Sequence, residues 1–329
     1  MPSVTLHLVL ADRVLERWLD TPQEAPFDPN HPSNTNAFFQ GAFGPDLGYF
    51  PGGYPLLSEL SHFVQSGDLA RALLHRAHTP AERAFAWGWV THVLADQQVH
   101  PLVGRAVGEF LYGDRNLFAD GARHPAAHVQ VETGLDAFFS GMFPNVRGRR
   151  MAPVFDVESI GFLQGAYRDV YGITVDSSVF LASHLAVARK SCQGLMTIGV
   201  LSAASTVHSD SAPGASARWL ARKVLAIVKL GLGRHPLAKA FLSPTPPAEW
   251  LIEGVEKVLE GFPDAFDQHY RTGLRELENF NLDTGGVQEE TPMHTGTVRV
   301  LESLAKEGIQ FPHSDQDTGQ PVARLSPAA

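Results

Sequence analysis

One helical segment constrains this chain more than any other part of its sequence. From Trp87 to His100 the residues read WGWVTHVLADQQVH, in which apolar side chains surround His92, Asp96 and His100. These three residues are spaced at i, i+4 and i+8, so on an α-helix they share one stripe that drifts by only about 40° per step. Because the rest of the segment is apolar, we expect the stripe to be buried, and a buried charge requires a partner or a metal ion.

Apolar residues recur at helical spacing along most of the chain, whereas short alternating runs rich in Val, Ile and Thr are scarce. The sequence therefore predicts an all-α fold, a multi-helix bundle. Residues 22–53, rich in proline and glycine, are expected to form a long loop, and Pro101 is expected to bend or end its helix. The expected helices are Val4–Leu19, Leu56–Gln65, Gly67–Ala77, Ala81–Phe110, Pro125–Ser140, Glu158–Tyr171, Ser177–Ser205, Ala215–Leu232, Ala248–Asn279 and Thr297–Lys306.

The charge balance bears on the possible partners. There are 26 Lys and Arg against 35 Asp and Glu, a formal charge of −9. This balance argues against sequence-independent binding of double-stranded nucleic acid, because such binding requires clustered basic residues. The single cysteine, Cys192, cannot form an internal disulfide, so a disulfide-crosslinked scaffold is excluded.

A second pair of metal-competent residues follows the first stripe. The segment AAHVQVETG places His128 and Glu132 at i and i+4 on another expected helix. Two helices that each offer such a pair can hold cations between them, because imidazole and carboxylate are both good zinc ligands. A single pair of this kind is more often a satisfied core or surface pair, and it is the combination with the buried stripe that favours metal binding.

Further candidates lie upstream, with Asp46 in FGPDLGYFPGG and His62 in LSELSHFV. In order and spacing, eight residues now resemble the metal ligands of the zinc-dependent phospholipase C family, whose related branch contains single-strand nucleases and 3′-nucleotidases. The resemblance covers about Thr5 to Phe139 and implies an all-helical phospholipase C and nuclease-like bundle with a three-zinc cluster. The eight residues are His7, Asp46, His62, His92, Asp96, His100, His128 and Glu132.

The resemblance also implies how these ligands are shared. One zinc would be held by Asp46, His62, His92 and Asp96, and a second by His100, His128 and Glu132. A third would be held by Asp96, by His7 and, in the family, by an N-terminal tryptophan. This chain has no tryptophan near its start, although removal of Met1 would leave the Pro2 amine five residues before His7. We therefore expect two or three zinc ions.

The implied activity is zinc-dependent cleavage of phosphate esters, foremost the hydrolysis of a phospholipid-type phosphodiester by metal-activated water. Asp46 is the catalytic candidate, as general base or as the residue that orients the water, and simple metal ligation is an equal alternative. Three rival functions stay open. They are a single-strand nuclease or 3′-nucleotidase, a biosynthetic enzyme that reuses the zinc cluster on a small molecule, and a metal-stabilised binding protein.

Two features bear on the substrate. Choline-preferring members carry aromatic cage residues at positions that correspond here to Leu47 and Glu59, which puts a cation cage in doubt. The aromatic residues of the 38–54 loop are better explained by packing than by a rebuilt pocket. Residues 215–242 form a basic amphipathic stretch that could contact an anionic membrane surface, although a core helix with a basic outer face is the favoured interpretation.

Residues 1–150 are expected to be the zinc-binding catalytic region. Residues 151–329 are expected to be a helical region that packs on it, within a single compact domain or as a second one, with 314–329 as a loose tail. His184, His208, His235, His269, His294 and His313 lack ligand spacing and are interpreted as structural or exposed. The start lacks a basic segment followed by a long apolar one, and no window is apolar enough to span a bilayer, so a cytoplasmic protein is expected.

Overall fold

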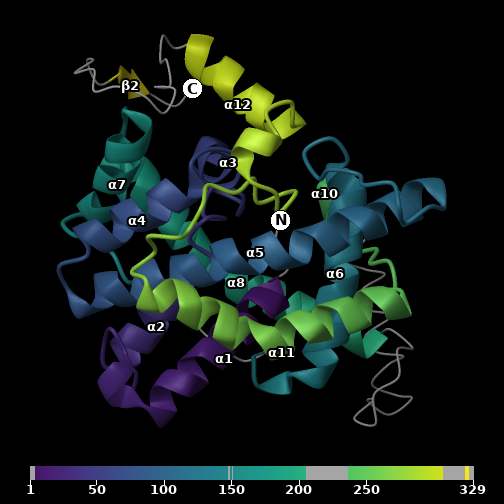
Figure 1. Ribbon diagram of the computed structural model, residues 1–329, viewed down its shortest axis with the longest axis horizontal. Helices are drawn as coiled ribbons and strands as arrows, with labels where there is room; N and C mark the ends of the chain where they lie inside the picture. Colours follow the sequence, from purple (N-terminus) through teal and green to yellow (C-terminus); the bar gives the residue numbers. More distant parts are fainter. Residues whose placement is uncertain (1–3, 147–148, 150, 205–235, 307–322, 326–329) are drawn as a thin grey trace.

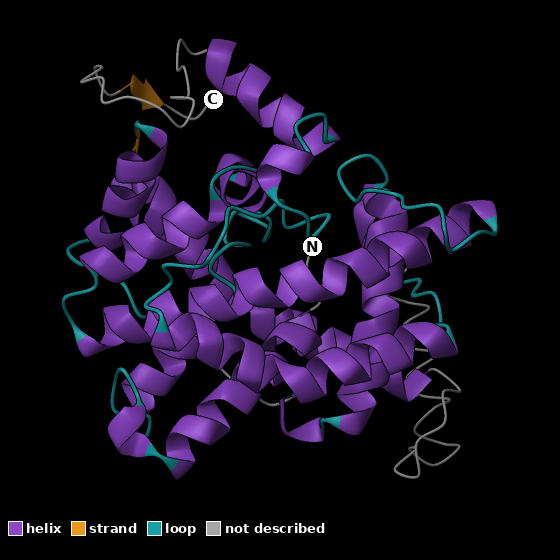
Figure 2. Ribbon diagram, in the orientation of Figure 1, coloured by secondary structure: helices purple, strands orange, loops and turns teal. Residues whose placement is uncertain are grey.

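The computed structural model describes residues 4–146, 149, 151–204, 236–306 and 323–325. Helices dominate this part of the chain, with two short strands at one corner (Figure 2), so the all-α prediction is confirmed. The elements are α1 Val4–Asp20, η1 Pro22–Glu24, α2 Pro32–Gly41, α3 Pro55–Phe63, α4 Ser66–Arg76, α5 Pro80–Tyr112, α6 Pro125–Met142, η2 Pro144–Val146, α7 Gly161–Tyr171, β1 Ile173–Val175, α8 Ser177–Ala204, α10 Pro236–Phe241, α11 Glu249–Arg271, η3 Gln288–Glu290, α12 Thr295–Lys306 and β2 Ala323–Leu325.

Helix α5 runs through the middle of the molecule (Figure 1), where α1, α2, α4, α6 and α11 pack against it. A capping box fixes its start, because the Thr79 side chain accepts from the Glu82 amide and the Glu82 carboxylate accepts from the Thr79 amide. Gly113, with φ of 72°, ends the helix. Pro101 lies inside α5, so the expectation that it could end the helix is wrong. Helix α2 packs on α5 before this residue, at Gly88, and α11 packs on it after this residue, at Leu102.

Helix α2 lies within the stretch that the sequence predicts to be a loop, and that prediction is wrong. Pro32 occupies the first turn, where a missing amide hydrogen costs nothing, and Phe38 and Phe39 are buried. The helix crosses α5 at a pair of glycines. A Cβ atom on Gly41 would lie 2.0 Å from the Phe85 carbonyl oxygen, and one on Gly88 would lie 1.9 Å from the Phe38 carbonyl oxygen. The two backbones can approach this closely only because both side chains are missing.

Gly88→Ala is therefore expected to destabilise the fold by about 1–3 kcal/mol, because the added methyl must push α2 away from α5. Thermal unfolding of the variant measures this cost. Gly161→Ala is the matched control, since a Cβ there meets no atom within 4 Å. Equal stability of the two variants would contradict the close crossing.

The described residues that follow 150 pack on the same core as those that precede it. One hydrophobic cluster includes Leu8 and Val90 from the first region and Val255 and Phe266 from the second. Three expectations here need correction. Helix α11 ends at Arg271, eight residues before the expected end. Thr272 is its C-cap, and turns follow. Helix α10 was not expected, and neither was the parallel pair of β1 and β2.

The pair of strands also corrects part of the expected loose tail. Residues 323–325 form hydrogen bonds with the backbone of 173–175, which orders them as a strand. The expected helix at 215–232 and most of the basic stretch 215–242 lie outside the described residues. Among the helices that the structure describes, none has the length and apolar character needed to cross a bilayer.

Candidate metal centre

Helices α5 and α6 bring the two predicted pairs face to face. The Nε2 atom of His92 lies 3.0 Å from Asp96 Oδ2, and that of His128 lies 3.2 Å from Glu132 Oε1. His100 joins the two pairs, because its Nε2 atom lies 3.4 Å from Asp96 Oδ1 and 3.1 Å from Glu132 Oε1. All five side chains are buried, as the apolar surroundings predict.

Three other elements supply the remaining predicted residues. His7 comes from α1, His62 from α3, and Asp46 from the turns between α2 and α3. Asp96 lies at the centre of the group, 3.3 Å from His7 Nε2 and 3.7 Å from His62 Nε2. Asp46 lies 3.2 Å from His62 Nε2 and 3.6 Å from His92 Nδ1. The structure thus brings all eight predicted residues into one buried cluster.

Asp136 fixes the helix that carries His7. Its two carboxylate oxygens accept hydrogen bonds from the amides of Val4 and Thr5, each at 2.8 Å. A carboxylate at this position satisfies amides that have no partner within the helix and favours the positive end of the helix dipole. His7 then stacks on His92, with ring centroids 3.9 Å apart and planes 6° apart. Since Asp136 is one turn after Glu132 on α6, the same helix positions both sides of the cluster.

Backbone carbonyls fix the orientation of three imidazoles. The Nδ1 atom of His62 lies 2.8 Å from the Ser58 carbonyl oxygen, and that of His92 lies 2.8 Å from the Ala42 carbonyl oxygen. The Nδ1 atom of His100 likewise contacts the Leu282 carbonyl oxygen. A carbonyl only accepts, so each Nδ1 carries a hydrogen, and each Nε2, which faces the carboxylates, is the nitrogen that would offer its lone pair to a metal ion. This tautomer is the one that metal-binding histidines use when an outer partner holds the opposite nitrogen.

Several buried atoms of the cluster have no hydrogen-bond partner. These atoms are the two oxygens of Asp46 and one atom each of His7, His92, Asp96, His128 and Glu132. Such concentration in one place is unusual, because buried polar atoms are nearly always paired. Imidazole nitrogens and carboxylate oxygens suit zinc. Three groups of the cluster place one ligand atom per residue within 4.8 Å of one another, namely His7, His92 and Asp96; Asp46, His62 and His92; and His100, His128 and Asp283. The donor set therefore fits metal ions.

Charge in the metal-free cluster is shared between carboxylates and imidazoles. Burial would raise the pKa of Asp96, but the imidazoles of His100, His92 and His7 outweigh it and hold this pKa well below its usual range. Burial also acts against the charged form of His100, but Asp96 and Glu132 outweigh it and raise the pKa of the imidazole to about 10. Protons on the imidazoles therefore supply part of the positive charge that a bound cation would supply.

The stabilisation by zinc is expected to grow between about pH 6 and pH 8. In the metal-free chain the ion pairs of His100 contribute fully below its usual pKa of 6.5 and are lost as the pH rises towards about 10. Zinc must displace the proton of His100, so a rising pH favours the zinc-bound form. Thermal unfolding with zinc and with a chelator should give a difference in Tm that widens with pH. A difference that stays constant or narrows would contradict this account.

Two residues beside the cluster, Asp283 and His294, are not predicted from the sequence to take part in it. Asp283, after α11, lies with Oδ1 3.8 Å from His128 Nδ1 and Oδ2 3.0 Å from His294 Nε2. The interpretation of His294 as structural or exposed is therefore incomplete, because it is buried and its partner faces the cluster. Of the other histidines interpreted in this way, His184 and His269 are described, while His208, His235 and His313 lie outside the described residues. His184 accepts hydrogen bonds from the amides of Val154 and Phe155, and burial lowers its pKa to about 4.

The loop over the cluster packs mainly on the core, as expected. Tyr49 is different, because it is only partly buried and its ring lies 5.2 Å from that of His62. Burial, together with Glu59 and Asp46, raises the pKa of its phenol well above the usual range, so this group stays a proton donor. The buried phenylalanines of the loop and of α2 are Phe38, Phe39, Phe43 and Phe50.

The two positions at which choline-preferring members carry cage residues, Leu47 and Glu59, have other roles here. Leu47 is buried in the core, and Glu59 forms an ion pair with Arg299 at 2.7 Å. The doubt about a cation cage at these positions is therefore justified.

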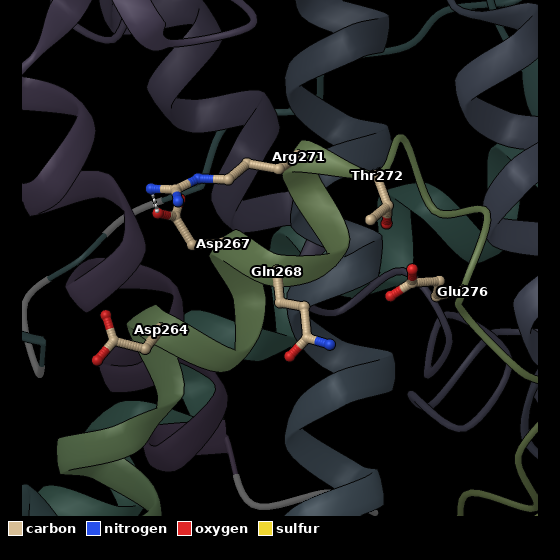
Figure 3. Close-up of a pocket in the computed structure, with 6 residues that line it drawn as sticks. All are labelled: Asp264, Asp267, Gln268, Arg271, Thr272 and Glu276. Carbon is tan, nitrogen blue, oxygen red and sulfur yellow. Dashed lines mark hydrogen bonds and ion pairs between the residues drawn. The ribbon is translucent and has the colours of Figure 1, made fainter.

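A surface pocket along α11 offers acidic groups away from this cluster (Figure 3). Two of its three carboxylates already have cationic partners, since Asp267 lies 2.8 Å from Arg271 and Asp264 lies 2.7 Å from Arg17. None of the eight predicted ligands is among the residues that line it. The buried cluster is therefore the better candidate for a functional site.

The fold and the cluster define an all-helical protein with a candidate metal centre of histidines and carboxylates. Residues 6–164 match the family model described as zinc dependent phospholipase C. The predicted resemblance is thus confirmed. The match ends within α7, so Asp283 and His294 lie beyond it. Searches of the curated proteins and of the solved structures found no match.

Proposed function

We propose that this chain is a zinc-dependent phosphodiesterase of the phospholipase C type. The observation that carries the proposal is the orientation of the imidazoles, whose Nε2 atoms converge on shared carboxylates while backbone carbonyls hold the Nδ1 atoms of three of them. The match of residues 6–164 to a zinc-dependent family supports the choice of metal. The residues proposed to hold two or three zinc ions are His7, Asp46, His62, His92, Asp96, His100, His128 and Glu132.

Each part of the site has a task in this proposal. Zinc, when bound, supplies a Lewis acid that makes water easier to ionise and neutralises the charge of phosphate oxygens. Asp46 holds metal and accepts the proton of the attacking water, because both of its oxygens are buried and accept no hydrogen bond. Tyr49 donates a hydrogen bond to the phosphate, since its phenol stays protonated beside His62.

The proposed substrate is a phospholipid or a related phosphodiester. Positions 47 and 59 provide no aromatic ring for a choline cation, so we propose that the enzyme has no preference for choline headgroups. Membrane contact through 215–242 and a cytoplasmic location stay predictions from the sequence. Residues 151–329 are proposed to be part of one functional unit with the first region, because both contribute to one core and to one cluster.

The test is a substrate panel run with the full-length chain. We expect vesicles of several phospholipids to release diacylglycerol and a phosphorylated headgroup, with activity lost in a chelator and restored by zinc. Single-stranded DNA, RNA and 3′-nucleotides form the second arm, and faster turnover there would replace the lipid with a nucleic-acid substrate. A zinc-loaded chain that hydrolyses neither class would overturn the proposal in favour of a biosynthetic or binding role.

A further inference from the structure

The segment from Asn281 to Asp283 touches the cluster at three points, although it lies far beyond the family match. The Leu282 amide donates to the His62 carbonyl oxygen at 2.8 Å, and the Leu282 carbonyl accepts from His100 Nδ1. The next residue, Asp283, faces His128. This short irregular segment therefore meets ligand candidates of α3, α5 and α6.

Three hydrogen bonds fix the position of the Asp283 carboxylate. Its Oδ1 accepts from the Gly121 amide at 3.0 Å, and its Oδ2 accepts from the Ala122 amide at 2.9 Å and from His294 Nε2 at 3.0 Å. The Gly296 amide donates to His294 Nδ1, which is therefore a lone-pair acceptor, so the hydrogen of this imidazole is on Nε2. His294 thus donates to Asp283 and helps to keep the carboxylate ionised.

The space between Asp283 and His128 is kept open by a glycine. A Cβ atom on Gly121 would lie 2.6 Å from Asp283 Oδ1 and 2.6 Å from His128 Nδ1. His128 Nδ1 is buried and has no hydrogen-bond partner, while its Nε2 faces Glu132. The carboxylate at 3.8 Å is thus the polar group that faces this nitrogen in the part of the chain that the structure describes.

We propose that Asp283 is a positioning residue of the metal centre, which orients the imidazole of His128 and is itself held by His294. A carboxylate behind a histidine fixes the ring and makes the opposite nitrogen a better ligand, and loss of such a partner typically lowers metal affinity 10- to 100-fold. The inference rests on the proposed function, because it takes His128 to be a zinc ligand. Asp283 and His294 would thus contribute to the site from the part of the chain that lies beyond the family match.

A different arrangement would make Asp120, Asp283 and His294 a separate cation site, since their ligand atoms also lie close together. The hydrogen bonds argue against it. His294 Nε2 carries a hydrogen that points to Asp283, and Asp120 Oδ1 accepts from the Arg123 amide at 2.6 Å while lying 4.0 Å from His294 Nε2. Asp283 and His294 are thus bound to each other and form a support for His128, whereas Asp120 is engaged by the Arg123 amide.

Zinc affinity of the full-length chain, measured by competition with a chromogenic chelator, tests the proposal, together with the absorption spectrum of the cobalt-substituted chain. We expect Asp283→Asn to keep the number of bound ions, to weaken the binding of one of them about 10- to 100-fold, and to shift the cobalt bands. His294→Gln should weaken the same ion by a smaller factor. Asp120→Asn, the matched control, should bind zinc as the unmodified chain does.

Wild-type affinity and cobalt bands in both Asp283→Asn and His294→Gln would overturn the proposal. Complete loss of one ion in both Asp283→Asn and Asp120→Asn would overturn it in favour of a separate cation site. If Asp283→Asn fails to fold, judged by its unfolding in chelator, His294→Gln decides, because it leaves the carboxylate in place. Absence of tightly bound zinc from the unmodified chain would instead be a failure of the proposed function.

Discussion

His92→Ala is expected to lose bound zinc and to unfold at a much lower temperature than the unmodified chain. His92 has no exposed surface, lies 3.0 Å from Asp96 and 3.6 Å from Asp46, and stacks on His7. Its removal takes away an imidazole that two buried carboxylates, Asp96 and Asp46, share. Breaking a buried charge network in this way typically costs about 3–5 kcal/mol. Elemental analysis and thermal unfolding of the same preparation measure both effects.

His184→Ala is the matched control for this prediction. His184 is also a buried histidine, but it accepts hydrogen bonds from the backbone of Val154 and Phe155 and has no contact with the cluster. The control should lose stability through the unpaired amides and should keep its zinc. If His92→Ala retained the zinc and the Tm of the unmodified chain, a buried metal site at α5 would be disproved.

Asp46→Asn is expected to bind most of its zinc while turnover falls about 100-fold or more. Asparagine has nearly the same shape and keeps one oxygen ligand, but it cannot accept a proton, and general base catalysis typically contributes 10²- to 10⁴-fold. The carboxylate is buried and its oxygens accept no hydrogen bond, so the substitution removes no hydrogen-bonded partner. Steady-state kinetics should show the loss in kcat, with zinc content measured on the same sample.

Asp264→Asn serves as the control for Asp46→Asn. Asp264 is an exposed carboxylate of the α11 pocket, and its replacement should leave kcat unchanged. Full activity of Asp46→Asn would remove this residue from the mechanism. Loss of activity that parallels loss of zinc would make Asp46 a metal ligand alone.

The residues of the cluster that helical spacing alone predicts lie on two long, regular helices, α5 and α6. The i, i+4 and i+8 spacing of His92, Asp96 and His100 fixes their common face wherever the helix packs, so apolar surroundings were enough to predict burial. The pair of His128 and Glu132 follows the same rule. The meeting of these two helices was not predictable from spacing, and it was the resemblance in ligand order that indicated it.

Asp283 and His294 could not be predicted in this way because they lie on irregular backbone. Their positions depend on amides of Gly121 and Ala122 and on turns near Asn281, which leave no periodic pattern in the sequence. Helix α2 differs from the predicted loop for another reason. Prolines and glycines usually interrupt helices, but Pro32 stands at a helix start, where proline is favoured, and Gly41 permits a close crossing.

The metal content of the full-length chain, purified without a metal-affinity tag, shows whether the buried cluster binds zinc. Elemental analysis should find about two or three zinc ions per chain, since the donor groups of the cluster fit ions of this class. The zinc should stay bound through dialysis against buffer and leave in a strong chelator, with a fall in Tm. A chain that binds no metal tightly, and whose Tm is the same with and without chelator, would contradict the account.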